Sequence, residues 1–341
     1  MTATPAPLRL ALLAGGGLAA ALVIGLMVGP ASLGPGEVLA EVADRMPFVS
    51  LDSGLSEREA SILWDIRAPR VVLGMLVGAA LAGSGAAYQG VFRNPLADPY
   101  LLGVAAGAGL GATIVIVFAG PGSVLVPLAA FVGAIAAVVA TYGLGAAAGG
   151  RRTGLTLILA GVAMASFLTA LQTFVQQQNT DVIREVYSWI LGRLGTAGWG
   201  EVRLMLPYAA VSFVALVLHR RLLDVLAVGE EEAGTLGVRP ALVRGVVVVA
   251  ASLAAAAAVA VAGLIGFVGI IVPHTVRLLA GPSYRRIVPL SLVAGAAFLV
   301  LADVAARSVL SPAEIPIGVV TAFVGGPFFL LVLRTARKGL A

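Results

Sequence analysis

The stretch LVRGVVVVAASLAAAAAVAV at residues 242–261 is twenty residues long, and only Arg244 in it is charged. A helix rises about 1.5 Å per residue, so twenty apolar residues cross a bilayer core of roughly 30 Å. Similar runs recur along the 341-residue chain, of which 60% is hydrophobic and only 11% is charged. A soluble domain is about one quarter charged. The sequence therefore predicts an all-α polytopic membrane protein.

Ten transmembrane helices account for the apolar runs. The first run is longer than the 7–15 apolar residues of a signal peptide, so we expect a retained helix. We expect one transmembrane domain over residues 1–341, with an acidic extracytoplasmic segment at about 30–65 and a longer connection at about 220–244. The predicted spans are approximately 8–28, 71–88, 101–118, 124–144, 155–175, 204–218, 242–261, 264–279, 287–306 and 315–333.

Loop charge predicts the orientation of these spans. An even number of spans puts both termini on one side of the membrane, and cytoplasmic loops are enriched in Lys and Arg. Of the 22 basic residues, the side with the termini would hold Arg9, Arg93, Arg151, Arg152, Arg220, Arg221, Arg239, Arg244, Arg277, Arg285, Arg286, Arg334, Arg337 and Lys338. The other side would hold the remaining eight. We therefore expect both termini in the cytoplasm.

The composition also excludes several kinds of site. Cysteine is absent and there are two histidines, which excludes disulfides and any thiolate or multi-histidine metal site. The net charge is +5, but the basic residues are scattered between the spans. We therefore assign them to membrane orientation and expect no nucleic-acid partner. The sequence contains no HExxH motif, no paired acids within spans and no nucleophile with an obvious base. We expect neither an enzyme nor a chain that binds a cofactor.

The one lysine, Lys338, follows Thr335, Ala336 and Arg337. A Walker A loop needs a lysine directly after its glycines to hold the nucleotide phosphates. The chain therefore does not hydrolyse ATP by itself.

Glycines four residues apart are frequent inside the predicted spans. Gly74 and Gly78 are one pair, and Gly103, Gly107 and Gly111 form a longer series. Small residues at this spacing allow helix backbones to approach closely in a membrane. No strand is predicted before residues 107–111, so this series is assigned to helix packing rather than to a nucleotide-binding loop.

Three stretches carry a family resemblance. The first combines RAPR at residues 67–70 with RNPLADP at residues 93–99, and the second is GFVGIIVPH at residues 266–274. The third is LADVAAR at residues 301–307, which continues to EIPIGVV at residues 314–320. In this order they resemble the permease family that serves the ABC importers of vitamin B12, haem and ferric siderophores.

The resemblance implies a homodimer in the bacterial inner membrane, with a translocation path along the dimer axis. Two cytoplasmic ATPase subunits would supply the ATP and Mg sites, and an extracytoplasmic binding protein would deliver the substrate. We expect iron chelates, either a ferric siderophore or haem, with cobalamin as the alternative within the family. An ion-gradient-driven secondary transporter is the alternative of a different class. It usually has ionisable groups deep in its spans. Here the acids concentrate in the 30–65 segment and the loops, with Asp303 near one end of its span as the principal exception, which disfavours this alternative.

The resemblance assigns Arg67, Arg70 and Arg307 to docking of the binding protein. Guanidinium groups pair bidentately with carboxylates, which suits this role. Arg67 and Arg70 could instead be interfacial anchors. Arg307 could instead neutralise Asp303, four residues earlier on the same helix face.

Asn94, Pro95 and Leu96 match the cytoplasmic gate of the family. Proline interrupts the helix there, and freed backbone within a membrane protein is tolerated where it lines a cavity. An ordinary Asn-Pro turn is the alternative. A second gate segment would fall near residues 153–155, where the family pattern matches poorly.

The connection at about 220–244 contains GEEEAGTLG at residues 229–237. This stretch is similar to the short helix that couples such permeases to the ATPase, and a solvated loop is the alternative. The resemblance assigns this role to Glu230, Glu231, Glu232, Ala233, Gly234, Leu236 and Gly237.

Gln172 and Gln176 lie near the extracytoplasmic end of the predicted span at residues 155–175. Uncharged polar side chains could line a path for a large substrate without binding it tightly. An amide-rich helix end is the alternative, and both remain open.

Overall fold

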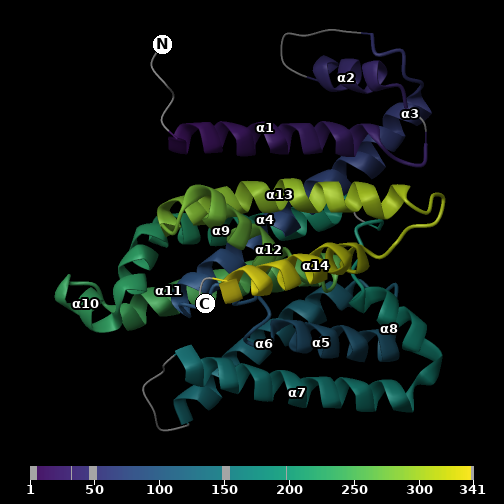
Figure 1. Ribbon diagram of the computed structural model, residues 1–341. Coiled ribbons are helices and arrows are strands. Elements are labelled where there is room, and N and C mark those ends of the chain that lie inside the picture. Colours follow the sequence, from purple (N-terminus) through teal and green to yellow (C-terminus); the bar gives the residue numbers. More distant parts are fainter. Residues whose placement is uncertain (1–5, 32, 46–51, 148–153, 197, 339–341) are drawn as a thin grey trace, which may run out of the picture.

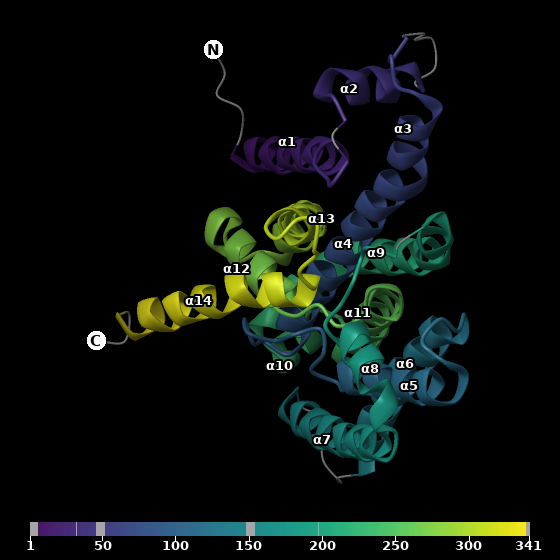
Figure 2. The ribbon, with the colours of Figure 1, turned by 90° about the vertical axis from the view of Figure 1, so that its right-hand side faces the viewer.

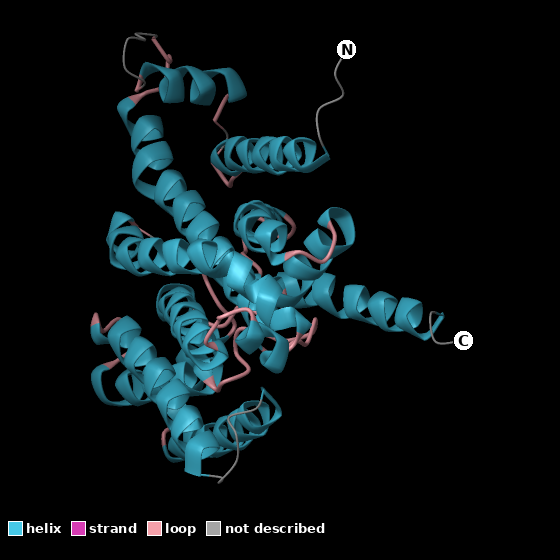
Figure 3. Ribbon diagram, turned by 90° about the vertical axis from the view of Figure 1, so that its left-hand side faces the viewer, coloured by secondary structure: helices cyan, strands magenta, loops and turns pink. Residues whose placement is uncertain are grey.

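The computed structural model describes residues 6–31, 33–45, 52–147, 154–196 and 198–338. These residues form helices joined by loops, without a strand (Figure 3). The long helices are α1 (Ala6–Met27), α4 (Ala68–Val91), α5 (Val104–Ala119), α6 (Leu125–Ala147), α7 (Gly154–Gln178), α9 (Trp199–Val228), α11 (Pro240–Ala262), α12 (Val268–Ala280), α13 (Tyr284–Ser308) and α14 (Ile317–Lys338), and α4 and α14 run across the direction of α1 and α13 (Figure 1, Figure 2).

Shorter helices mark the two ends of this bundle. They are α2 (Pro35–Asp44), α3 (Glu57–Ser61), a π-helical turn (Ile62–Arg67), a 3₁₀ turn (Thr180–Val182), α8 (Ile183–Ile190) and α10 (Glu230–Thr235). Helix α8 lies at one end and α10 at the opposite end (Figure 1). We refer to them as the α8 end, which is predicted to be extracytoplasmic, and the α10 end, which is predicted to be cytoplasmic.

The polytopic all-α membrane fold is confirmed. Among the described residues, seven helices are long and apolar enough to cross a membrane. Three shorter apolar helices span residues 104–119, 268–280 and 317–332. Each of the ten predicted spans falls on one of these ten helices. Because three of them are short, the count of ten spans stays a prediction, as does the location of the termini.

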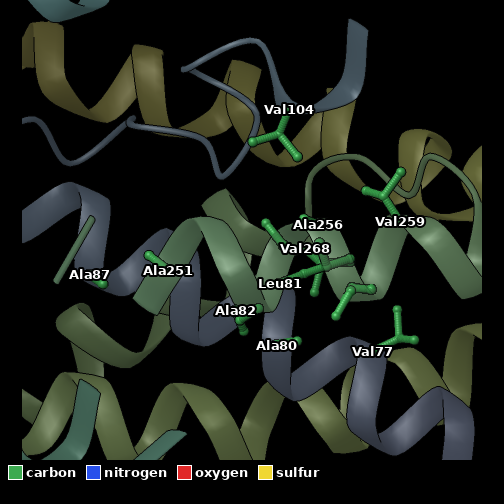
Figure 4. Close-up of a cluster of buried hydrophobic side chains, with 14 of the residues drawn as sticks. Val77, Ala80, Leu81, Ala82, Ala87, Val104, Ala251, Ala256, Val259 and Val268 are labelled. Atoms are coloured by element: carbon green, nitrogen blue, oxygen red, sulfur yellow. The ribbon is translucent and has the colours of Figure 1, made fainter. Parts of the chain in front are cut away.

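Helix α4 lies at the centre of the bundle and packs against α9, α11, α12 and α13 (Figure 2). Nearly all of its side chains are buried. The core around it consists mainly of alanine, valine and leucine, including Val77, Leu81, Ala251 and Val268 (Figure 4). Because so many of these side chains are small, the helices can pack with their backbones close together.

Glycine permits the closest helix crossings, as the four-residue spacing predicts. A Cβ atom at Gly78 would clash with the backbone oxygen of Gly295 on α13, and one at Gly107 would clash with that of Gly133 on α6. Gly107 lies within helix α5, so the series at residues 107–111 packs helices and forms no loop.

Two segments without helix meet inside the bundle. One follows α4 over residues 92–103, and the other joins α11 to α12 over residues 263–267. The Tyr100 hydroxyl donates to the backbone oxygen of Ile265 at 3.0 Å and accepts from the Ile265 backbone N–H at 3.2 Å. Backbone groups freed from a helix need such partners in a membrane protein. Tyr100 therefore connects the two segments and provides hydrogen-bond partners for the backbone groups of Ile265.

The acidic segment at about 30–65 forms a folded cap at the α8 end. Its carboxylate Glu41 accepts hydrogen bonds from the Ser53 hydroxyl at 2.7 Å and from the Trp64 indole at 2.9 Å. The Trp199 indole at the start of α9 donates to the Trp64 backbone oxygen at 2.9 Å. The Glu41 bonds hold the cap together, and the Trp199 bond attaches it to the membrane helices.

Candidate functional site

Four charged side chains meet at the α8 end. The Arg70 guanidinium on α4 donates to the Asp303 carboxylate on α13 at 2.8–3.1 Å. It also donates to Glu314, in the connection between α13 and α14, at 2.7 and 3.0 Å. Asp303 is also 3.5 Å from the guanidinium of Arg307. This Arg70 cluster ties α4, α13 and the α13–α14 connection together.

Burial makes the Arg70 cluster important for the fold. Arg70, Asp303 and Arg307 are buried, whereas the Glu314 side chain is 39% exposed. A buried charge is tolerated when it is paired and hydrogen-bonded. Arg70 and Asp303 meet this condition through a fork of parallel bonds, the geometry in which guanidinium and carboxylate pair best.

Arg67 is also buried, and it closes the end of α1. Its guanidinium donates to the backbone oxygens of Leu26 and Met27 at 2.9 and 2.8 Å, and to that of Ala31. The last carbonyl groups of a helix lack partners within the helix. Arg67, in the turn before α4, donates the hydrogen bonds that these carbonyl groups lack.

Arg307 donates to the backbone oxygen of Gly25 in α1 at 2.7 Å. Its predicted pair with Asp303 is present, but Arg70 makes the shorter bonds to that carboxylate. All three predicted docking arginines are therefore bonded within the chain in this conformation. Docking of a binding protein by them stays a prediction, and it would require these bonds to be exchanged.

A cavity of about 350 Å³ lies beside the Arg70 cluster. Arg70, Asp303 and Glu314 form one wall, and the connection between α8 and α9, including Arg193 and Thr196, forms another. The α8 end therefore presents a charged hollow at the predicted extracytoplasmic surface.

The Glu314–Arg70 bond has a predicted pH dependence. The hydrogen bond from Arg70 lowers the pKa of the Glu314 carboxyl below its ordinary value of 4.5. A carboxyl with a lowered pKa stabilises the fold above its unfolded-state pKa, and this contribution is lost as the pH falls through the folded-state pKa. We expect wild type to melt above Glu314→Gln at about pH 7 and the difference to shrink as the pH is lowered below 4.5. A difference in melting temperature that persists at the lower pH would contradict this assignment.

The predicted gate residues form a turn at the α10 end. The Asn94 side-chain oxygen accepts from the Leu96 backbone N–H at 3.0 Å, and Asn94 and Leu96 are half-buried while Pro95 is exposed. This is the local geometry of an Asx turn, and it interrupts the helix as predicted. The gating role stays a prediction. In the second gate segment, Thr153 lies outside the described residues and Gly154 begins α7.

The predicted coupling segment contains the short helix α10, which projects from the bundle (Figure 1). Ala233 is fully buried and anchors α10 to the body. Leu236 at its end is 69% exposed. The other coupling residues with described side chains, namely Glu231, Glu232, Gly234 and Gly237, are exposed as well. The segment therefore presents an apolar side chain among carboxylates at the surface.

The glutamines occupy different environments. Gln172 is buried, and its amide donates to the Thr113 hydroxyl on α5 at 3.1 Å. It joins α7 to α5 in this conformation. Gln176 is half-buried, one turn further along α7. A role for either residue in lining a pathway stays a prediction.

Comparison with known proteins identifies the family. A family model described as the FecCD transport family matches residues 17–335. The chain belongs to this family. It is 42% identical over 284 residues to the Cobalamin import system permease protein BtuC of Halobacterium salinarum, which covers 83% of this chain and 76% of the relative. It is 38% identical over 280 residues to the Iron(3+)-hydroxamate import system permease protein FhuB of Bacillus subtilis, with 82% and 73% covered.

A solved structure supports the same assignment. A metal-chelate type ABC transporter in an inward-facing conformation superposes with a TM-score of 0.82 at 29% identity, covering 96% of this chain and 98% of the other. The resemblance to the permeases of vitamin B12 and iron-chelate importers is thereby confirmed. The chain is an ABC importer permease and a multi-pass protein of the bacterial inner membrane.

Sequence reasoning did not find three residues that shape the permease. Glu314 lies within a quoted motif, but its bond to Arg70 joins residues 244 positions apart. Tyr100 follows the predicted gate and bonds the unwound segment at Ile265. Asp224 accepts from the Ser283 hydroxyl and the Tyr284 backbone N–H at the start of α13. Motif spacing could have indicated Glu314, whereas Tyr100 and Asp224 carried no such signal.

Proposed function

We propose that the permease acts as a homodimer that imports a large metal chelate by alternating access. The observation that carries this proposal is the family match over nearly the whole chain. Two ATPase subunits would bind at the α10 end and hold ATP and Mg. A substrate-binding protein would dock at the α8 end. The permease itself would perform no chemistry and hold no cofactor.

The α10 end has the features that an ATPase partner requires. A short helix that inserts into a partner groove needs an apolar anchor, and Leu236 is such an anchor at the tip of α10. The buried methyl group of Ala233 and the contacts of α10 with α9 and α11 would transmit the partner's motion into the membrane helices.

The α8 end supports docking in a different way. Arg67, Arg70 and Arg307 hold α1, α4 and α13 in place, so they would shape the docking surface even while bonded within the chain. If acidic residues of the binding protein compete for these guanidinium groups, docking would loosen the same helix contacts. Substrate delivery would thereby be linked to opening of the path, with Asn94, Pro95 and Leu96 closing its cytoplasmic side.

Ferric chelates are the first substrate candidate, because several relatives of this family are named for iron chelates or an iron hydroxamate. One is the Probable iron chelatin transport system permease protein of Helicobacter pylori, 37% identical over 280 residues. Cobalamin is the second candidate. It is favoured by the 42% identity to the Halobacterium salinarum protein and the 39% identity to the Vitamin B12 import system permease protein of Shigella boydii.

Uptake into proteoliposomes tests the proposal. The permease would be reconstituted with the ATPase and binding protein of its own genome and offered a ferric hydroxamate, haem and cobalamin in turn. The proposal expects uptake of one class that requires ATP and both partners, and none with an ATPase variant that cannot hydrolyse ATP. Uptake that follows an imposed proton or sodium gradient without the ATPase would instead establish a secondary transporter.

A further inference from the structure

A groove on the side of the bundle lies between three helices near the α8 end, where α6 and α9 begin and α11 ends. Two adjoining cavities, of about 250 and 330 Å³, lie between α6, α9 and α11. They share the residues Val124, Pro127, Leu204, Ala260 and Val261. The two cavities therefore form one groove, which we call the α6–α9–α11 groove.

The inner part of the groove is apolar and lies at membrane depth. Its deeper lining includes Phe131, Tyr208 and Ala257, and the Phe131 and Tyr208 rings pack 5.1 Å apart. Ala257 is five residues before the end of α11, which corresponds to a depth of about 7 Å at 1.5 Å per residue. The rim is open, since Leu128 is 58% and Leu204 47% exposed. In a bilayer this opening faces the acyl chains.

The outer part of the groove is polar. It is lined by Arg193, Glu201, Ser123 and Thr196, with the buried ring of Trp189 beside them. The Arg193 backbone N–H donates to the Ala262 oxygen at 2.9 Å, which fixes this residue over the end of α11. Its exposed side chain forms no ion pair or hydrogen bond with any residue that the structure describes. An unpaired guanidinium therefore lies at the end of the groove that is predicted to be extracytoplasmic.

The charges around the opening are balanced. Glu201 is half-buried, and one oxygen of its carboxylate accepts a hydrogen bond from the Gly198 backbone N–H at 2.9 Å. Among the described residues, Arg193 and Glu201 are the two charged side chains that line the groove. Because one cation and one carboxylate line it, the opening suits a headgroup with both signs of charge better than one with net negative charge.

We propose that the α6–α9–α11 groove binds a phospholipid with a zwitterionic phosphoethanolamine headgroup. An acyl chain occupies the apolar part between Phe131, Tyr208 and Ala257. The phosphate pairs with Arg193, since guanidinium binds phosphate bidentately. The ammonium group lies against Glu201. This proposal depends on the membrane location alone and not on the proposed substrate or partners.

Lipid retention and selectivity test the proposal. The permease would be purified in mild detergent, exchanged into equimolar dioleoyl-phosphatidylethanolamine and dioleoyl-phosphatidylglycerol, and stripped of loosely held lipid. Native mass spectrometry then counts the lipid that remains bound. We expect one retained phosphatidylethanolamine per chain, and a loss of about tenfold in retention for Arg193→Gln, as expected when a charge-assisted bond is removed.

Variants distinguish the contribution of the headgroup to binding from that of the acyl chain. Glutamine at position 201 can still accept the hydrogen bond from the Gly198 backbone N–H at the start of α9, so Glu201→Gln keeps the fold. Its preference for phosphatidylethanolamine over phosphatidylglycerol should fall several-fold. Ala257→Leu fills the apolar part and reduces retention of both lipids. If that variant does not fold, Leu128→Gln at the exposed rim tests the same part. Arg203→Gln is the matched control, because Arg203 is an exposed arginine of α9 that does not line the groove.

Three results would overturn the proposal. If Arg193→Gln retained lipid as wild type does, or Arg203→Gln lost it equally, the bound molecules would be general annular lipid. If millimolar inorganic phosphate raised the melting temperature through Arg193 while phosphatidylethanolamine did not, the site would bind free phosphate rather than lipid.

Discussion

Replacing Arg70 by methionine is expected to destabilise the permease by about 3–5 kcal/mol, the cost of leaving a buried charge unpaired. Arg70 makes three bonds to the buried Asp303 carboxylate and two to Glu314. Methionine keeps a long apolar side chain of adaptable shape, so the lost charge rather than a lost volume dominates. Arg307 cannot compensate fully, because it is 3.5 Å from Asp303 and is committed to the Gly25 backbone oxygen.

Thermal unfolding of the purified permease in detergent, without partner proteins, measures this effect separately from docking. The double variant Arg70→Met/Asp303→Asn should recover part of the lost stability, because the buried Asp303 carboxylate is removed together with its main partner, while Arg307 keeps its bond to the Gly25 backbone oxygen. Glu314→Gln should cost much less, because that carboxylate is partly exposed to solvent. If Arg70→Met and Glu314→Gln lowered the melting temperature equally, burial of the Arg70–Asp303 pair would not be the source of stability.

Most of the helical architecture could be predicted from apolar run length. Each predicted span corresponds to a helix, and the glycine spacing correctly indicated the close crossings at Gly78 and Gly107. Helices α5 and α12 are shorter than their predicted runs, because the segments at 92–103 and 263–267 leave the helix inside the bundle. Hydropathy could not indicate the loss of helix at residues 101–103 and 264–267, since unwound backbone that is bonded within the protein can be as apolar as helix.

The charged residues could be named from the sequence, but their partners could not. Asp303 was paired with Arg307 on the basis of four-residue spacing, and that ion pair exists. Its stronger partner, Arg70, is 233 residues away and comes within reach only when α4 packs against α13. A motif indicates that an arginine matters, whereas only the tertiary fold decides whether it faces a partner protein or a buried carboxylate.

Replacing Leu236 by aspartate is expected to reduce ATP-driven uptake at least tenfold while leaving the fold intact. Leu236 is 69% exposed, so the change exposes no new apolar surface and creates no cavity. In an apolar groove of the ATPase, however, a buried leucine anchor contributes about 2 kcal/mol or more, and an aspartate there would also have to lose its hydration. Both effects weaken the association in the same direction.

Uptake in proteoliposomes and co-purification of the ATPase measure this prediction together, with the melting temperature as a check on the fold. Val228→Asp is the matched control, because Val228 is 70% exposed at the end of α9 and is not one of the residues assigned to coupling. It should retain uptake and bind the ATPase. Normal uptake by Leu236→Asp would remove α10 as the coupling contact. An equal loss with Val228→Asp would mean that any added charge at this surface is harmful. The evidence for a specific coupling role of α10 would then be Ala233. Among the coupling residues whose side chains are described, it is the one with a fully buried side chain that packs α10 against the body.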